Sequence, residues 1–476
     1  MTAPRLADLT LIETAEAIAK GEITSEAATR SALDRLRSIG STLNCVIALD
    51  EADALTAARV ADVERTKGKL RGPLHGVPLA HKDLFFREGK VVTSGAKITR
   101  DFVAPTTATV LERLEAAGAI YVAALHLAEF ARSPTGHNEH FGPARNPWNL
   151  AHVTGGSSSG SGAAVAARLV SAALGSDTGG SIRLPASICG VVGLMPTQTR
   201  VSRAGVMPLS WSMDTVGPMA REARDCARLL TVIAGVDPRD PTTSQAPVPD
   251  YERAMPTTLK GLRIGVPRRF YYDPVTPDVG KALEESLRVF RDAGAVIADT
   301  DVPDMALIDE VQHVVRECEA ATVHSRWLRS RPKDFADQVR SRTEPGLFYT
   351  ATRYLEALDL RAPIVAEFLA TAFGDNDILH LPGVPIPVPT IAETTTGGPE
   401  AIAKMIRLVG HCTRHINFLG LPAIAVPCGF STSGLPVAFQ LIGRPFAEAT
   451  LLGAADRYQA ATEWRRRAPA VAAGAA

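Results

Sequence analysis

Two glycine- and serine-rich stretches hold the residues of this sequence that could carry covalent chemistry. The first reads TGGSSSGSG from Thr154 to Gly162, and the second reads GSDTGGSIRLP and begins at Gly175. A serine hydroxyl can act as an acyl nucleophile once a neighbouring base takes its proton. Flexible Gly/Ser linkers join separate domains, whereas apolar, packable sequence follows each of these stretches directly. We therefore expect rigid loops inside a folded domain.

Two other chemical interpretations use the same residues. A phosphate-binding loop needs a lysine after its last glycine, and neither stretch has one. Gly156 to Gly160 matches the G-x-S-x-G pattern of a nucleophile elbow, which would make Ser158 the nucleophile of an α/β-hydrolase-type esterase. Such an enzyme also needs a downstream histidine, for which the candidates are His380, His411 and His415. The preceding run NPWNLAHVT is a poor strand, so this alternative lacks the strand that an elbow requires.

The order of motifs along the chain resembles the amidase signature family. GGSSSGSGAAVAA and GSDTGGSIRLPASICGVVGLMPT are similar to its two central motifs, GPLHGVPLAHKDLF lies upstream, and GLPVAFQLIGRPF lies downstream. The likeness covers about residues 65–225 and about residues 415–455. The sequence departs from the family pattern at Ser159, Gly162 and Met195, where glycine, a small residue and a basic residue are common.

The resemblance implies a Ser-cisSer-Lys triad that works through an acyl-enzyme intermediate. Ser181 falls on the acyl nucleophile, Lys82 on the general base, and Ser157 on the serine that relays a proton between them at a cis peptide bond. Ser158 falls on a supporting hydrogen-bonding position. A free lysine titrates near about 10.4, so a lysine base must be desolvated and kept away from carboxylates. The run GVPLA before Lys82 is apolar, and alternation along a strand would direct Asp83 to the opposite face.

The second stretch is also expected to stabilise negative charge on the substrate. Glycines let the backbone turn its N–H groups inward, so those of Thr178, Gly179, Gly180 and Ser181 are expected to face the oxyanion of a tetrahedral intermediate.

Asp177 and Arg183 flank the nucleophile and are expected to brace its loop, as a buried ion pair or a helix cap, without direct chemistry. The pair His137 and His140 lies in a loop without a clear further ligand, so we expect no metal and no cofactor.

The surrounding sequence predicts the scaffold that these motifs need. Helix-like and β-leaning segments alternate, which favours an α/β fold with a mixed, largely parallel central sheet covered by helices on both faces. The expected helices are 24–39, about 51–66, 107–118 and 163–174, and the expected strands lie in 76–86, 119–125, 192–197 and 437–443.

We expect residues 1–65 to form a helical segment packed on the core, and residues 66–476 to form the amidase signature domain. A variable, substrate-side elaboration is expected at about 247–408. The irregular stretch 131–161 is long enough to be functional.

Composition limits the classes of partner. Fifty-one basic residues balance fifty-one acidic ones, and no basic run forms a patch, so neither nucleic acid nor a membrane is an expected partner. The N-terminus carries acids and a proline where a secretory signal would be apolar, and the six cysteines form no C-x-x-C pair. We expect a cytoplasmic protein with reduced thiols, a small-molecule substrate and, as an open option, a homodimer.

The predicted reaction is hydrolysis of a small amide, anilide or carbamate. The run FARSPTGHNEHFGPARNP differs from the M-G-S-S-x-E-N-S type of the amidotransferase subunits in this family, so we expect a stand-alone amidohydrolase. The alternative is a glutamine-hydrolysing A-type subunit of a tRNA-dependent amidotransferase, which would need a partner. Met207, Leu209 and Trp211 favour an aryl or medium-sized apolar substrate, unless they belong to the core. Pocket walls are expected from 125–140, 207–211 and about 310–390.

Overall fold

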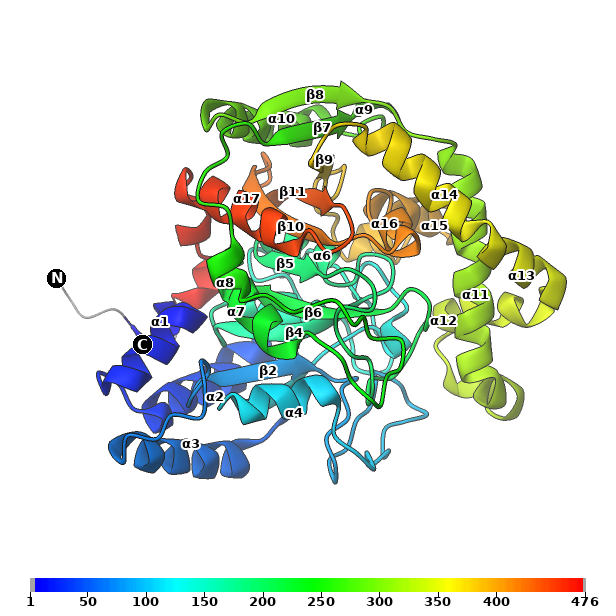
Figure 1. Ribbon diagram of the computed structural model, residues 1–476. Coiled ribbons are helices and arrows are strands. Elements are labelled where there is room, and N and C mark those ends of the chain that lie inside the picture. Colours follow the sequence, from blue (N-terminus) through cyan, green and yellow to red (C-terminus); the bar gives the residue numbers. More distant parts are fainter. Residues whose placement is uncertain (1–4, 474–476) are drawn as a thin grey trace.

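One eleven-stranded sheet runs through the protein (Figure 1). The structure is a computed structural model and describes residues 5–473. The strand order is β1-β3-β2-β4-β6-β5-β10-β11-β9-β7-β8. The strands are β1 (Val46–Leu49), β2 (Pro78–Lys82), β3 (Ile120–Leu125), β4 (Ala172–Asp177), β5 (Val192–Met195), β6 (Thr215–Ala220), β7 (Arg263–Pro267), β8 (Val296–Thr300), β9 (Ile378–Pro382), β10 (Ala423–Phe430) and β11 (Pro436–Gly443).

The mixed α/β sheet that the sequence predicts is confirmed, but its largely parallel character is wrong. Four neighbouring pairs are parallel and six are antiparallel. The βαβ alternation in the sequence describes β2 and β3, which are parallel. Later strands include β10 and β11, which are joined by residues 431–435, and a connection this short produces an antiparallel hairpin.

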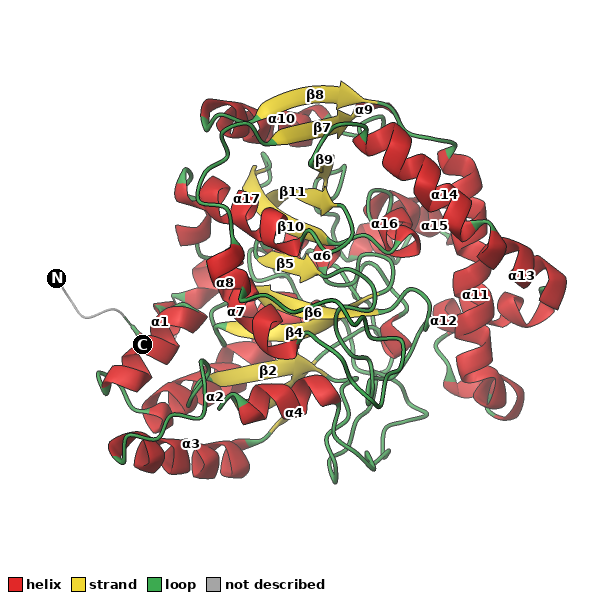
Figure 2. Cartoon of the chain, viewed as in Figure 1, coloured by secondary structure: helices red, strands yellow, loops and turns green. Residues whose placement is uncertain are grey.

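Helices cover both faces of the sheet (Figure 2). One face packs with α1, α4, α7, α10 and α17, and the other packs with α2, α3, α5 and α6 and, further along, with α11, α14 and α16. The helices are α1 (Leu11–Lys20), α2 (Ser25–Thr42), α3 (Glu51–Thr66), α4 (Thr109–Ala116), α5 (Ser159–Ala166), α6 (Arg183–Cys189), α7 (Ala223–Ile233), α8 (Tyr251–Ala254), α9 (Arg268–Tyr271), α10 (Pro277–Asp292), α11 (Met305–Ser330), α12 (Asp337–Thr343), α13 (Ala351–Asp359), α14 (Arg361–Phe368), α15 (Pro399–Val409), α16 (Arg414–Leu419) and α17 (Glu448–Ala460).

The helix predicted at 163–174 is wrong in its second half. Helix α5 ends at Ala166, and residues from Ala172 onward form β4 between β2 and β6. A short run of small apolar residues does not distinguish a buried helix from a buried strand. Here Ala172, Ala173 and Leu174 are buried in the middle of the sheet.

Residues 247–408 contribute to the sheet as well as to its surroundings. Strands β7, β8 and β9 extend the sheet, and α11 to α13 stand beside its end (Figure 1). Strand β1 lies before residue 65 and pairs with β3 beyond it. The division of the chain at residue 65 and the elaboration at 247–408 stay predictions.

Two further observations concern the described residues. All six cysteines are free and buried. Between residues 5 and 473, no helix combines the length and the apolar character needed to cross a bilayer.

Close backbone packing of α5 gives a test of the fold. A Cβ at Gly160 would lie 2.5 Å from both the Cys45 carbonyl oxygen and the His126 nitrogen. We expect Gly160→Ala to lower the free energy of unfolding by about 1–3 kcal/mol, because the helix must move off this backbone.

The matched control is Gly280→Ala in α10, where a Cβ would meet a single atom at an ordinary 3.5 Å. It should leave stability unchanged or raise it by about 0.5–1 kcal/mol through helix propensity. Denaturant titration of both variants measures the difference, and equal stabilities would contradict the packing described for α5.

Candidate active site

Strands β2 and β4 bring the two glycine- and serine-rich stretches to one edge of the sheet. The strands are parallel, with Ala80 opposite Ala173, so Lys82 and Asp177 end them at the same edge. Helix α5 starts within the first stretch, at Ser159, and α6 starts within the second, at Arg183. Ligands of α/β sheets bind beyond the carboxyl ends of parallel strands, which makes this edge the candidate active site.

Lys82 is fully buried and is held by hydroxyl groups. Its Nζ donates to Ser157 Oγ at 2.7 Å and to Ser176 Oγ at 2.9 Å. Within residues 5–473, no carboxylate oxygen lies within 4.0 Å of this amine. Burial lowers the pKa of Lys82 to about 7, although the charges of Asp177 and Asp214 act to raise it. A large fraction of the amine is therefore uncharged at neutral pH.

Asp83, the carboxylate adjacent to Lys82 in sequence, is directed elsewhere. Its Oδ2 accepts a hydrogen bond from the backbone N–H of Thr93 at 3.0 Å. Burial raises the pKa of Asp83 to about 7, so this group also loses charge near neutral pH. It does not hold the Lys82 amine as an ammonium ion.

Ser181 lies where the buried hydroxyls meet a cavity. Its carbonyl oxygen accepts the Ser158 N–H at 3.2 Å, and the residue lines the cavity together with Thr178 and Gly179. The Gly156–Ser157 peptide bond is cis. Among the described residues, the Ser157 and Ser181 side chains share no hydrogen bond. The structure thus brings Lys82 to Ser157 and places Ser181 beside that segment.

Two glycines have no room for a side chain. Gly180 has φ +120°, and a Cβ there would lie 2.3 Å from Thr413 Oγ1. A Cβ at Gly156 would lie 2.3 Å from the Ser133 carbonyl oxygen. Only glycine fits either position without moving the loop.

The backbone geometry corrects one predicted oxyanion donor. The Gly180 N–H donates to Asp177 Oδ1 at 2.7 Å, so it is engaged inside the loop and does not face a substrate. The Asp177 carboxylate accepts this N–H group, and the hydrogen bond closes the turn that follows β4. Thr178, Gly179 and Ser181 stay predicted donors.

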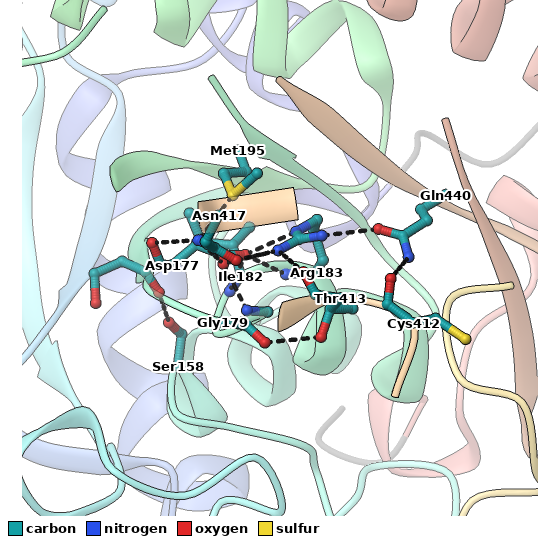
Figure 3. Close-up of polar contacts among 12 residues, drawn as sticks. Ser158, Asp177, Gly179, Ile182, Arg183, Met195, Cys412, Thr413, Asn417 and Gln440 are labelled. Atoms are coloured by element: carbon teal, nitrogen blue, oxygen red, sulfur yellow. Dashed lines mark hydrogen bonds and ion pairs between the residues drawn. The ribbon is translucent and has the colours of Figure 1, made fainter. Parts of the chain in front are cut away.

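Asp177 and Arg183 form a completely buried ion pair behind this loop (Figure 3). Arg183 donates from Nε to Asp177 Oδ2 and from Nη2 to Oδ1, both at 3.1 Å. Asp177 also accepts the backbone N–H groups of Ile182 and Arg183 at the start of α6. Burial acts to raise the pKa of Asp177, but the Arg183 guanidinium and these donors hold it below its usual range.

Three residues from the C-terminal part of the chain complete this network (Figure 3). Asn417 donates to Asp177 Oδ1 at 2.8 Å and accepts from Arg183 at 2.6 Å, and Gln440 accepts from Arg183 at 2.9 Å. Thr413 Oγ1 donates to the Gly179 carbonyl at 2.7 Å. The buried charges are therefore paired and hydrogen-bonded on all sides, as buried charges must be.

The unusual Met195 also belongs to this network. Its sulfur accepts a contact from Asn417 Nδ2 at 3.1 Å, at the position where the family commonly has a basic residue. A basic side chain there would lie close to Arg183, whose charge Asp177 already neutralises.

Sequence reasoning missed several residues of the site. Ser176 accepts a hydrogen bond from Lys82. Its position in the second glycine- and serine-rich stretch, one residue before Asp177, could have indicated that it belongs to the site. Asp214 accepts the Thr178 hydroxyl at 2.5 Å, and it lies in the run SMDTVGP, which resembles the family without an assigned role. Asn417 and Gln440 lie within the C-terminal part of the likeness, at about residues 415–455, but the resemblance assigned neither of them a role.

The nucleophile-elbow alternative finds no partner for its serine. Ser158 Oγ donates to the Ser176 carbonyl at 3.3 Å. His380, His411 and His415 each contact other groups and lie in no hydrogen bond with Ser158 within residues 5–473.

The histidines of the loop at 137–140 also find non-metal partners. His137 Nε2 lies 2.6 Å from Thr394 Oγ1, and His140 Nε2 lies 3.1 Å from a Glu129 oxygen. In the described part of the chain, no cluster of three or more His, Cys, Asp or Glu side chains could hold a metal ion.

A cavity of about 880 Å³ opens in front of Ser181. Its walls include residues 131–134, Leu209 and parts of α11 and α12, which lie in the three segments expected to form the pocket. Helix α15 also lines the cavity, although it lies outside those segments. Met207 and Trp211 line a smaller cavity of about 250 Å³, which shares Leu209 and Thr178 with the first. The large cavity carries five arginines, whose positive charge the sequence analysis did not single out: Arg132, Arg316, Arg342, Arg407 and Arg414.

Comparison with known proteins identifies the family. A family model described as Amidase matches residues 27–452. The chain belongs to the amidase family. It is an enzyme of the class that hydrolyses carbon–nitrogen bonds, and the resemblance stated from its motifs is confirmed. The curated relatives of this amidase-family chain include the A subunit of the glutamyl-tRNA(Gln) amidotransferase of Moorella thermoacetica, which is 40% identical over 97% of this chain and 98% of its own length.

Solved structures of the amidase family share the fold. A structure described as a vestigial complex that reveals the evolutionary origins of an s-triazine catabolic enzyme is 33% identical and has a TM-score of 0.88, covering 95% of this chain and 98% of its own. The native peptide amidase of Stenotrophomonas maltophilia is 31% identical with a TM-score of 0.85, covering 97% and 98%.

The buried ion pair generates a stability prediction. We expect Asp177→Asn to lower the free energy of unfolding by about 3–5 kcal/mol, because it leaves the Arg183 guanidinium buried without a counter-charge. The measurement is chemical denaturation followed by circular dichroism.

Asp292→Asn is the matched control. Asp292 pairs with Arg288 at 2.5 Å on the exposed side of α10, and such pairs contribute about 0–1 kcal/mol. If the two variants lose the same stability, Asp177 does not have the role described here.

Proposed function

We propose that this chain hydrolyses the C–N bond of a small carboxamide through an acyl-enzyme intermediate on Ser181. Lys82 acts as the general base and Ser157 relays the proton. The observation that carries the proposal is an enclosed lysine amine, free of carboxylate contacts, that donates to Ser157 beside a serine open to a cavity. An uncharged lysine in a desolvated position is a competent base.

The chemical steps follow from these positions. Ser181 Oγ attacks the amide carbonyl carbon while its proton passes through Ser157 to Lys82. The negative charge on the carbonyl oxygen is met by the N–H groups of Thr178, Gly179 and Ser181, and each such donor is worth about 10²- to 10³-fold in rate. The C–N bond then breaks as the amine takes the proton from Lys82, and water releases the acyl group from Ser181.

Two settings for this reaction differ in whether a partner is required. The relatives named as A subunits of the glutamyl-tRNA(Gln) amidotransferase, at about 40% identity over nearly the whole chain, favour the glutamine-hydrolysing A-type subunit. We therefore rank it above the stand-alone hydrolase expected from the sequence. Two observations still favour a stand-alone enzyme, namely the run FARSPTGHNEHFGPARNP and the similarity to the solved peptide amidase. A cytoplasmic location and a homodimer stay proposals.

Ammonia release separates the two settings. The purified chain should be assayed with glutamine, aliphatic amides, anilides and carbamates, alone and after co-expression with the remaining subunits of a bacterial tRNA-dependent amidotransferase. Glutamine turnover that requires those subunits supports the A-type subunit. Turnover of another amide by the chain alone supports the stand-alone enzyme.

The lysine base generates a prediction on pH dependence. Because the uncharged amine is the active form and its pKa is about 7, the acylation rate should rise between about pH 6 and pH 8 and then level off. Stopped-flow or single-turnover measurement with the best amide of the panel gives the profile.

The matching variants are Lys82→Ala, which should remove the rise together with most of the rate, and Ser181→Ala, which should form no acyl-enzyme by mass spectrometry. A rate that is flat from pH 6 to pH 9, or an acyl adduct that survives in Ser181→Ala, would refute the proposed roles.

A further inference from the structure

The cavity in front of Ser181 carries an excess of positive charge. Five arginines line it, against the two carboxylates of Asp309 and Glu310. Glu310 pairs with Arg353, which lies outside the lining. Asp309 lies 3.4 Å from His415, and its charge also acts on Arg414. The acids of the cavity therefore balance only a small part of its positive charge.

Two of the five arginines share one carboxylate. Arg132 and Arg316 both pair with Glu317, which lies outside the cavity lining and balances one of their two charges. Their charges hold α11 against residues 131–134. Arg132 and Arg316 therefore have a structural role among the five arginines of the cavity.

Arg342 and Arg414 are not neutralised. Within residues 5–473, neither guanidinium has a carboxylate oxygen within 4.0 Å. Arg342 donates to the Arg132 carbonyl at 2.9 Å, and Arg414 donates to the carbonyls of Gly410 and Arg407 at 3.1 and 3.0 Å. A guanidinium has five N–H donors, so both side chains keep donors for a further acceptor.

Burial and neighbouring positive charges make the charged forms of Arg342 and Arg414 energetically unfavourable unless an anion is bound. Burial, with the nearby charges of Arg132 and Arg316, lowers the pKa of Arg342 to about 9. Burial, with the charge of Arg316, lowers the pKa of Arg414 to about 10. Both side chains nevertheless keep some accessible surface and line the cavity. A bound anion would supply the counter-charge that the protein does not.

The cluster adjoins the reacting serine. The Cα of Arg414 lies 3.9 Å from the position that a Cβ on Gly179 would occupy, two residues before Ser181. Thr413 also donates to the Gly179 carbonyl. Ser181, Arg342 and Arg414 line the same cavity of about 880 Å³.

We propose that the acyl part of the substrate carries a carboxylate group that Arg342 and Arg414 bind, so that the chain acts on carboxamides of acidic compounds. This rests on the proposed acyl-enzyme chemistry at Ser181. A carboxylate accepts paired hydrogen bonds from planar guanidinium groups. Two sources supply this chemistry, namely an amino-acid amide such as glutamine and the monoamide of a dicarboxylic acid.

The kinetic test compares amides of equal shape and different charge. Glutaramate carries the carboxylate, glutardiamide is its neutral counterpart, and glutamine adds an ammonium group. The wild-type chain, assayed alone and after co-expression with the remaining amidotransferase subunits, should release ammonia from glutaramate or glutamine with a kcat/KM about 10- to 100-fold above that for glutardiamide. A preference for glutamine over glutaramate identifies the amino-acid source, and the reverse identifies the dicarboxylic acid.

The variant Arg342→Gln should remove this preference. Its kcat/KM for the anionic amides should fall about 10- to 100-fold, while that for glutardiamide changes less than about threefold, which also shows that the variant is folded. Arg340→Gln is the matched control, because Arg340 lies on the same helix, pairs with Asp337 and does not line the cavity. It should behave as wild type.

A binding measurement separates this proposal from the catalytic one. Calorimetry with glutarate on Ser181→Ala should detect binding, and the double variant with Arg342→Gln should lose it by at least about tenfold. Glutarate binding without turnover of any amide, either by the chain alone or in the presence of the remaining subunits, would refute the chemistry at Ser181 and keep the anion site. Equal kcat/KM for glutaramate and glutardiamide in the wild type, or glutarate binding unaffected by Arg342→Gln, would overturn the anion site.

Discussion

Lys82 is enclosed by protein, and no carboxylate of residues 5–473 lies within 4.0 Å of its amine. A buried lysine next to an aspartate would stay charged, and it could not take a proton from a serine. The site therefore depends on keeping nearby carboxylates occupied. Asp177 is bound to Arg183, Asp214 accepts the Thr178 hydroxyl, and the carboxylate of Asp83 turns away. Asp177 and Asp214 hold the loop that carries Ser181, and burial of the Lys82 amine outweighs the charges that these two carboxylates still exert on it.

The arginines on the two sides of Ser181 also differ in whether a carboxylate pairs with them. Behind the nucleophile, Arg183 is fully neutralised and has a structural role. In front of it, Arg342 and Arg414 line the cavity, and no carboxylate oxygen of residues 5–473 lies within 4.0 Å of either guanidinium. One side of Ser181 thus favours an uncharged base, and the other favours an anionic ligand. The glycines between them, with Gly180 at φ +120°, let the backbone pass from one environment to the other within a few residues.

The sequence selects Lys82, Ser157 and Ser181 through the resemblance of their motifs to the amidase signature family, and their catalytic roles stay a proposal. The structure brings Lys82 to Ser157, as that resemblance requires. The hydrogen bond of Gly180 to Asp177 depends on loop geometry, and no motif specifies it. The helix-covered mixed sheet followed from alternating segments, whereas strand direction depends on connections that a pattern does not show. The five arginines of the cavity come from the loop at 131–134 and from helices α11, α12, α15 and α16, so their meeting is a property of the tertiary fold.

The most direct test of this account is the protonation state of Lys82 in the folded enzyme. The Cε resonance of this side chain can be followed by carbon-detected NMR across pH in the Ser181→Ala variant, with Lys82→Arg to assign the signal. The account predicts a titration midpoint near 7, where burial places the pKa of this amine. A midpoint near the ordinary value of about 10.4 would mean a charged lysine at neutral pH and would contradict the proposed base.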